Sequence, residues 1–170
     1  MIDVDRQINA VSRTVGRRVL EAGEAHVVTL SQVYETTAED LWDCCTNPER
    51  IPRWFLPVSG DLRLGGRYQL EGNAGGEVLE CEPPHRFAAT WEYGDATSWI
   101  EVTITPEDDR ARFTLEHLAL PDEHWEQFGP GAVGIGWDLG MIGLALHLAS
   151  ADAVDSKAVE VWTTSPDGLR

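Results

Sequence analysis

The sequence predicts an α+β domain, in which a curved antiparallel β-sheet wraps around one long C-terminal α-helix. Clusters of Gly, Pro, Asn and Asp recur between residues 59 and 109 and separate runs of strand length, which is typical of an antiparallel meander. A stripe of large apolar residues at helical spacing follows between Gly131 and Ser150. The stripe consists of Val133, Trp137, Met141, Leu144 and Leu148. We therefore expect this helix to lie on one face of the sheet.

The N-terminal segment carries a second, weaker helical pattern. Val4, Ile8, Val11 and Val15 follow one another at spacings of four, three and four, which places them on one face of a helix. We expect residues 1–24 to form an N-terminal helical appendage to the domain.

The first strand and two short helices are predicted next. Residues 25–34 are rich in β-branched and aromatic side chains, so they favour a long strand. Thr37 followed by acidic residues indicates a helix N-cap, and Asn47-Pro48 ends that helix after Cys45. A second helical turn is expected from Pro48 to Trp54, because proline is tolerated at the first position of a helix.

The meander is predicted as five strands with one covered face. The strands are expected at residues 67–71, 77–82, 87–93, 98–105 and 111–120. Phe113, Leu115 and His117 alternate with polar residues, so these three side chains should point toward the helix. A weaker helical pattern after residue 150 assigns residues 151–170 to a C-terminal tail, which leaves one domain at residues 25–150.

Composition limits the partners of this chain. Its 170 residues carry a formal net charge of −16, from 29 acidic against 13 basic side chains, so polyanions such as nucleic acids and anionic membranes should be repelled. The start of the chain lacks the basic and apolar regions of a signal peptide, so we expect a cytoplasmic protein. The apolar stretch from Gly131 to Ala149 carries Asp138, which favours a core helix over a membrane span.

Metal and cofactor chemistry is not indicated. The three cysteines include the adjacent pair Cys44 and Cys45, a spacing that suits neither a disulfide framework nor zinc. The histidines show no pair at metal-ligand spacing, and the glycines near residue 131 lack the preceding strand and the lysine of a phosphate loop. We therefore expect no metal and no cofactor.

Several motifs in order resemble one known family. They are Thr37–Trp42, Asn47–Phe55, Gly65–Tyr68, Pro83–Phe87 with Thr90–Glu92, Arg112–His117 and Gly136-Trp137. Together they are similar to the family named after the activator homologues of the heat-shock-protein-90 ATPase, within the START-related SRPBCC superfamily. The resemblance covers roughly residues 25–150.

The resemblance implies a helix-grip fold with a cavity between the sheet and the long helix. In the eukaryotic cochaperone after which the family is named, this domain is accompanied by another, and nothing in the present chain resembles that other domain. More distant relatives bind lipids, hormones or polyketide intermediates in the cavity. Because one fold hosts many functions, the resemblance by itself implies only a ligand-binding pocket.

Large aromatic residues are concentrated in the segments that should surround this cavity, and ligand sites are usually apolar clefts with a few polar groups. We expect a small apolar or aromatic ligand, with His117 and Asp138 as polar anchors. Glycines within the long helix should mark close approach of the sheet or of a ligand. The predicted cavity residues are Trp54, Phe55, Tyr68, Trp91, Phe113, His117, Trp137, Asp138 and Met141.

Two alternatives to a binding protein remain open at this stage. A polyketide cyclase or dehydratase-like enzyme would use the same pocket, with His117 or Asp138 transferring the proton. A chaperone or protein-interaction module would bind a partner through the acidic surface, and its association would weaken with salt. No residue is assigned as catalytic, and a homodimer is left open.

Overall fold

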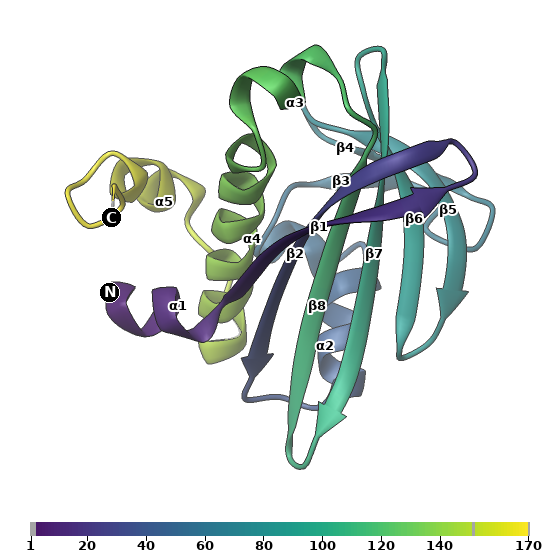
Figure 1. Ribbon diagram of the computed structural model, residues 1–170. Helices are drawn as coiled ribbons and strands as arrows, with labels where there is room; N and C mark the ends of the chain where they lie inside the picture. Colours follow the sequence, from purple (N-terminus) through teal and green to yellow (C-terminus); the bar gives the residue numbers. More distant parts are fainter. Residues whose placement is uncertain (1–2, 151, 170) are drawn as a thin grey trace.

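The computed structural model describes residues 3–150 and 152–169 and shows a single antiparallel sheet with helices against one face (Figure 1). The sheet has eight strands in the order β1-β2-β8-β7-β6-β5-β4-β3. The strands are β1 (Ser12–Leu20), β2 (Gly23–Tyr34), β3 (Val58–Gly60), β4 (Arg67–Leu70), β5 (Gly75–Glu82), β6 (Arg86–Tyr93), β7 (Ala96–Glu107) and β8 (Arg110–Ala119). The α-helices are α1 (Val4–Ala10), α2 (Ala38–Thr46), α3 (Glu123–Phe128), α4 (Gly131–Ser150) and α5 (Ser156–Thr163), with a 3₁₀ turn η1 (Ile51–Arg53). The predicted α+β helix-grip architecture is confirmed.

The core lies between the inner face of the sheet and the helices α2 and α4. Leu30 of β2, Ile104 of β7, Leu41 of α2 and Leu144 of α4 are almost completely buried in one cluster. The helices contact mainly β2, β7 and β8, so the inner face of β4–β6 is left without a helix directly upon it. This uneven coverage decides where the domain has open space.

Local sequence explains how α2 begins and ends. The hydroxyl of Thr37 accepts a hydrogen bond from the backbone N–H of Asp40 at 3.2 Å, which supplies the predicted N-cap. Leu41 and Cys44 lie on the buried face of the helix. The helix ends at Thr46 with Asn47 as its C-cap, and the following Pro48 cannot donate a backbone hydrogen bond to continue it.

Two of the four glycines expected to allow close approach in α4 do so. A Cβ atom at Gly143 would lie 2.3 Å from the backbone oxygen of Trp54, so α4 packs directly on the backbone that follows η1. A Cβ atom at Gly140 would lie 3.5 Å from the ring of Phe55. No protein atom described by the structure lies within 4 Å of the corresponding positions at Gly134 and Gly136, so the sheet does not approach the helix there.

The prediction for the N-terminal segment is wrong beyond Ala10. Residues 12–20 form strand β1, which pairs with β2 along its whole length, from Ser12 opposite Ser31 to Leu20 opposite Gly23. The helical spacing of the valines was coincidental, because Val15 points to solvent and only Val11 of the predicted stripe is buried. Residues 1–24 are therefore not a helical appendage: their larger part is an edge strand of the domain's sheet.

The tail and the long helix lie on the side of the molecule where both chain ends are found (Figure 1). The predicted short helix of the tail is present as α5, and the backbone N–H of Val154 donates to the carbonyl of Arg53 at 2.7 Å. By length and composition alone Val133–Ser150 could also cross a membrane, a test that core helices of soluble proteins pass as well. Here Met141 and Leu144 of this helix are buried against the sheet.

Alanine substitution should have opposite effects at two glycines of α4. We expect Gly143→Ala to lower the free energy of unfolding by about 1–3 kcal/mol, because the new methyl group meets a backbone oxygen that cannot move freely. Gly136→Ala, which adds a methyl group to open space in the same helix, should raise it by about 0.5–1 kcal/mol. Urea denaturation of both variants measures the difference, and equal effects at the two positions would contradict the packing described.

Candidate functional site

An apolar cavity of about 450 Å³ lies between the inner face of the sheet and the helices. Its walls come from α2, η1, the strands β4–β8, the β3–β4 loop and α4. The largest side chains around it are Trp42, Trp54, Phe55, Tyr68, Phe87, Trp91, Phe113, Trp137 and Met141. The cavity occupies the part of the sheet that α2 and α4 leave uncovered.

Contacting aromatic rings form one wall. The rings of Trp54 and Phe55 lie 5.4 Å apart, Phe55 stacks on Trp137 at 5.9 Å, and Trp137 packs against Trp91 at 4.9 Å. These side chains come from the residues that follow η1, from α4 and from β6. Rings from separate elements hold one another in place, so the wall is stiff and presents flat apolar surfaces.

Most of the predicted cavity residues are where they were expected. Seven of the nine line the cavity: Trp54, Phe55, Tyr68, Trp91, Phe113, Trp137 and Met141. The two polar anchors do not. His117 lies behind the aromatic wall, and Asp138 lies outside the cavity.

His117 is a structural hydrogen-bonding residue. Its Nδ1 accepts from the indole N–H of Trp137 at 3.0 Å, so the proton of the neutral ring is on Nε2, which faces the hydroxyl of Ser98 at 2.8 Å. That hydroxyl in turn donates to the backbone oxygen of Trp91 at 3.1 Å. Burial lowers the pKa of His117 from 6.5 to about 4. The ring is therefore neutral near pH 7, and both of its nitrogens are occupied.

The placement of Asp138 corrects the prediction of a second polar anchor. Its carboxylate pairs with the guanidinium of Arg13 at 2.6 Å, on the partly exposed side of α4. Adjacent helical positions are turned by about 100°, so a residue next to the cavity-lining Trp137 faces away from it. The partner Arg13 belongs to β1, the strand that the sequence pattern did not reveal.

Several cavity residues were not predicted. Leu62, Arg63 and Leu64 of the β3–β4 loop lie at the mouth, and the thiols of Cys45 and Cys81 lie in the wall. Arg63 is exposed and pairs with Asp61 on the same turn at 2.8 Å. The glycines Gly65-Gly66 predict a loop at this position. The sequence of the loop does not predict that its residues line the cavity.

Few side chains of the cavity wall are ionisable. Burial raises the pKa of the Cys45 thiol far above its usual range, which keeps it protonated and weakly nucleophilic. Among the described residues, no group of His, Cys, Asp and Glu side chains is placed to hold a metal ion. Arg63 is the one permanently charged side chain among the described residues that line the cavity.

The remaining large aromatic residues of the expected set do not line the cavity, although Trp125 packs against the main core cluster. Trp99 belongs to a second apolar cluster with Val27 and Leu118. Trp125 stacks on His26 with ring centroids 4.4 Å apart, and Phe128 is exposed.

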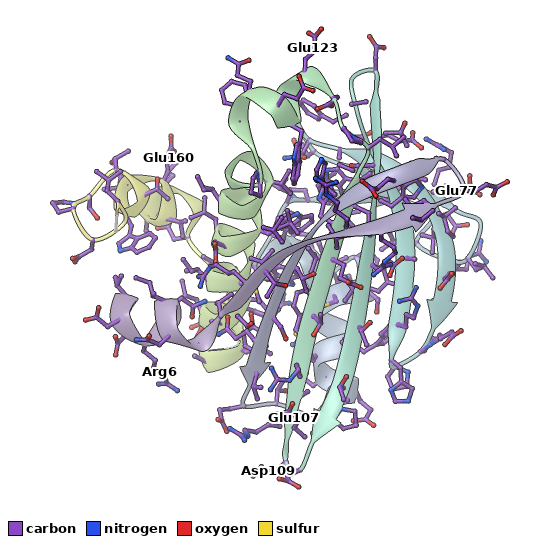
Figure 2. The ribbon with its side chains drawn as sticks, viewed as in Figure 1. Arg6, Glu77, Glu107, Asp109, Glu123 and Glu160 are labelled. Carbon is purple, nitrogen blue, oxygen red and sulfur yellow. The ribbon has the colours of Figure 1, made fainter. Side chains whose placement is uncertain are left out.

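Charged side chains gather outside the cavity. Figure 2 shows labelled acidic residues such as Glu107, Asp109 and Glu123 at the periphery of the molecule, beside strand ends and helices. On the outer face of the sheet, Glu101 and Glu116 alternate with buried positions, and both pair with Arg18 at 2.8 Å. Acidic surface and apolar interior are thus separated by the sheet.

A family model for activator of Hsp90 ATPase homolog 1-like proteins matches residues 35–148. The chain belongs to this family. CalU16 from Micromonospora echinospora is 35% identical; its crystal structure has a TM-score of 0.73 over 84% of this chain and 88% of that chain. The solution NMR structure of CalU16 gives a TM-score of 0.75 over 89% and 80%. No protein of curated function matches this chain significantly.

More distant structures share the fold. Protein MLL2253 from Mesorhizobium loti is 21% identical, with a TM-score of 0.66 over 74% of this chain and 98% of that chain. DynU16, described as a protein of the dynemicin biosynthetic locus, is 19% identical, with a TM-score of 0.62 over 75% of this chain and 48% of that chain. The family and the helix-grip fold are thus established. These comparisons identify no ligand, so a proposal for the ligand has to rest on the geometry of the cavity.

The depressed pKa of His117 predicts a specific pH dependence of stability. The unfolded chain takes up a proton near pH 6.5, whereas the folded ring resists it until about pH 4, so stability is lost as the pH falls through this window. We expect this residue to account for a loss of about 3 kcal/mol, from 1.36 kcal/mol per pH unit.

His117→Gln removes the titrating group and keeps a polar side chain. Denaturant unfolding at pH 7, 5.5 and 4 should show a steeper loss in the unmodified protein than in the variant. Parallel curves for the two proteins would show that His117 is not the group responsible.

Proposed function

We propose that this protein binds a small, largely apolar aromatic molecule in the cavity between the sheet and α4. The observation that carries the proposal is an apolar open space of about 450 Å³ between the inner face of the sheet and the helices. Ligand pockets commonly have 300–1,000 Å³ and an apolar lining with few polar groups. An unfilled apolar cavity lowers stability, so its persistence favours a role in binding.

The enzymatic alternative has less support. A cyclase or dehydratase needs an acid or base within hydrogen-bond reach of its substrate. His117 is behind the wall with both nitrogens occupied, and Asp138 is on the outside of α4. A binding protein needs neither group.

The interaction-module alternative rests on charge alone. The net charge of −16 favours basic partners, but no described patch distinguishes one part of the acidic surface from another. The relative DynU16 is described as belonging to a biosynthetic locus, which agrees with a small-molecule ligand, although at 19% identity it supports only the fold. We propose a small-molecule partner in the cytoplasm.

Filling the cavity should abolish binding without unfolding the domain. Ala89 of β6 lines the cavity and is buried, so Ala89→Phe places a ring in the space of the ligand. Native mass spectrometry of freshly purified protein, followed by extraction of any co-purifying molecule, should find a defined ligand that the variant lacks.

Thr105→Phe is the matched control, because it adds the same ring at an exposed position of β7. The control should retain the ligand. If neither the unmodified protein nor the control carries a ligand, and a panel of aromatic compounds produces no mass shift, the binding proposal fails.

A further inference from the structure

The indole N–H groups around the cavity fall into two classes. Those of Trp54 and Trp137 donate to the protein, at 2.9 Å to the carbonyl of Cys44 and at 3.0 Å to His117. Those of Trp42 and Trp91 have no acceptor among the residues that the structure describes. Within the same residues no buried polar side-chain atom lacks a partner, so both of these N–H groups must lie in space that a water molecule can reach.

Trp91 is the better placed of the two donors. Its ring packs against Trp137 at 4.9 Å and meets His117 edge-on at 6.1 Å, and its backbone oxygen accepts from Ser98. These contacts hold the indole in one orientation at the aromatic wall. A donor that is already fixed loses little entropy when it binds an acceptor.

The other polar groups of the cavity wall differ in what they can offer a ligand. The hydroxyl protons of Tyr68 and Thr46 are committed to the backbone oxygens of Thr90 and Trp42, at 2.7 and 2.8 Å, so these two hydroxyls can only accept from a ligand. At the mouth, Arg63 uses Nε and one terminal nitrogen on Asp61 and can only donate. The wall therefore has unused donors, and an unpaired donor that an apolar ligand covers is costly.

We infer that the ligand carries a hydrogen-bond acceptor oxygen, of the aromatic ketone or quinone class, which accepts from the indole N–H of Trp91. This inference rests on the proposed function and specifies its ligand class. A plain hydrocarbon or a fatty chain would cover the N–H without pairing it. The flat rings of Trp54, Phe55 and Trp137 favour a fused-ring skeleton over a flexible chain.

A matched pair of probes tests the inference. Fluorene and 9-fluorenone share one flat tricyclic skeleton and differ by a methylene group against a carbonyl group. Affinities are measured by displacement of the reporter dye 8-anilinonaphthalene-1-sulfonate. The informative quantity is the ratio of the two dissociation constants, fluorene over fluorenone, because it removes effects that act on the skeleton alone.

Trp91→Phe keeps a ring and removes the N–H. We expect the ratio to fall about 3- to 10-fold in this variant, the range expected for one neutral hydrogen bond, while fluorene binds at least as tightly as before. Trp54→Phe is the matched control, since that indole N–H is used inside the protein, and its ratio should equal that of the unmodified protein. Thermal unfolding verifies that both variants are folded.

The outcomes separate this inference from the proposed function. If both probes bind and the ratio is unchanged in Trp91→Phe, the acceptor assignment is overturned and the binding function stands. A ratio that changes only in Trp42→Phe would likewise overturn the assignment to Trp91. If neither probe binds the unmodified protein, the proposed function fails, and the ligand class fails with it.

Discussion

The rest of the structure depends on how α4 sits on the sheet. At one point Gly143 brings the helix onto the backbone oxygen of Trp54, and the hydroxyl of Tyr34 reaches the carbonyl of Met141 at 3.2 Å. Around Trp137 bulky rings fill the interface instead. The helix is thus close to the sheet at β2 and separated from it by aromatic side chains above β4–β6. The cavity is the consequence of this uneven contact, because backbone and rings cannot compress to fill it.

The polar groups next to the cavity stabilise its wall. His117 is held neutral by burial and joins Trp137 of α4 to Ser98 of β7, so it connects the helix to the sheet through hydrogen bonds. Breaking this connection would leave buried groups unpaired, which costs more than the bond contributes when made. The same arrangement orients the indole of Trp137 and, through Ser98, the strand that carries Trp91.

Membership of the family and likeness to CalU16 establish the fold, and a fold of this kind hosts many functions. The lining of the cavity includes four tryptophans, and the N–H groups of two of them have no acceptor among the described residues. Apart from Arg63 at the mouth, the described lining of the cavity carries no permanent charge, and charged side chains are concentrated outside. A neutral, flat molecule with acceptor oxygens is the occupant that this division favours.

The sequence by itself determined the order of the elements, the alternation of the meander and the apolar stripe of the long helix, because these depend on periodicities within one segment. For the same reason seven of nine cavity residues could be named. Strand β1 and the position of Asp138 were decided only by tertiary structure, since the Arg13–Asp138 pair spans 125 residues. His117 was placed on the correct face, but its distance from the cavity depends on Trp137 of another element. Contacts between distant segments leave no periodic signal in either segment.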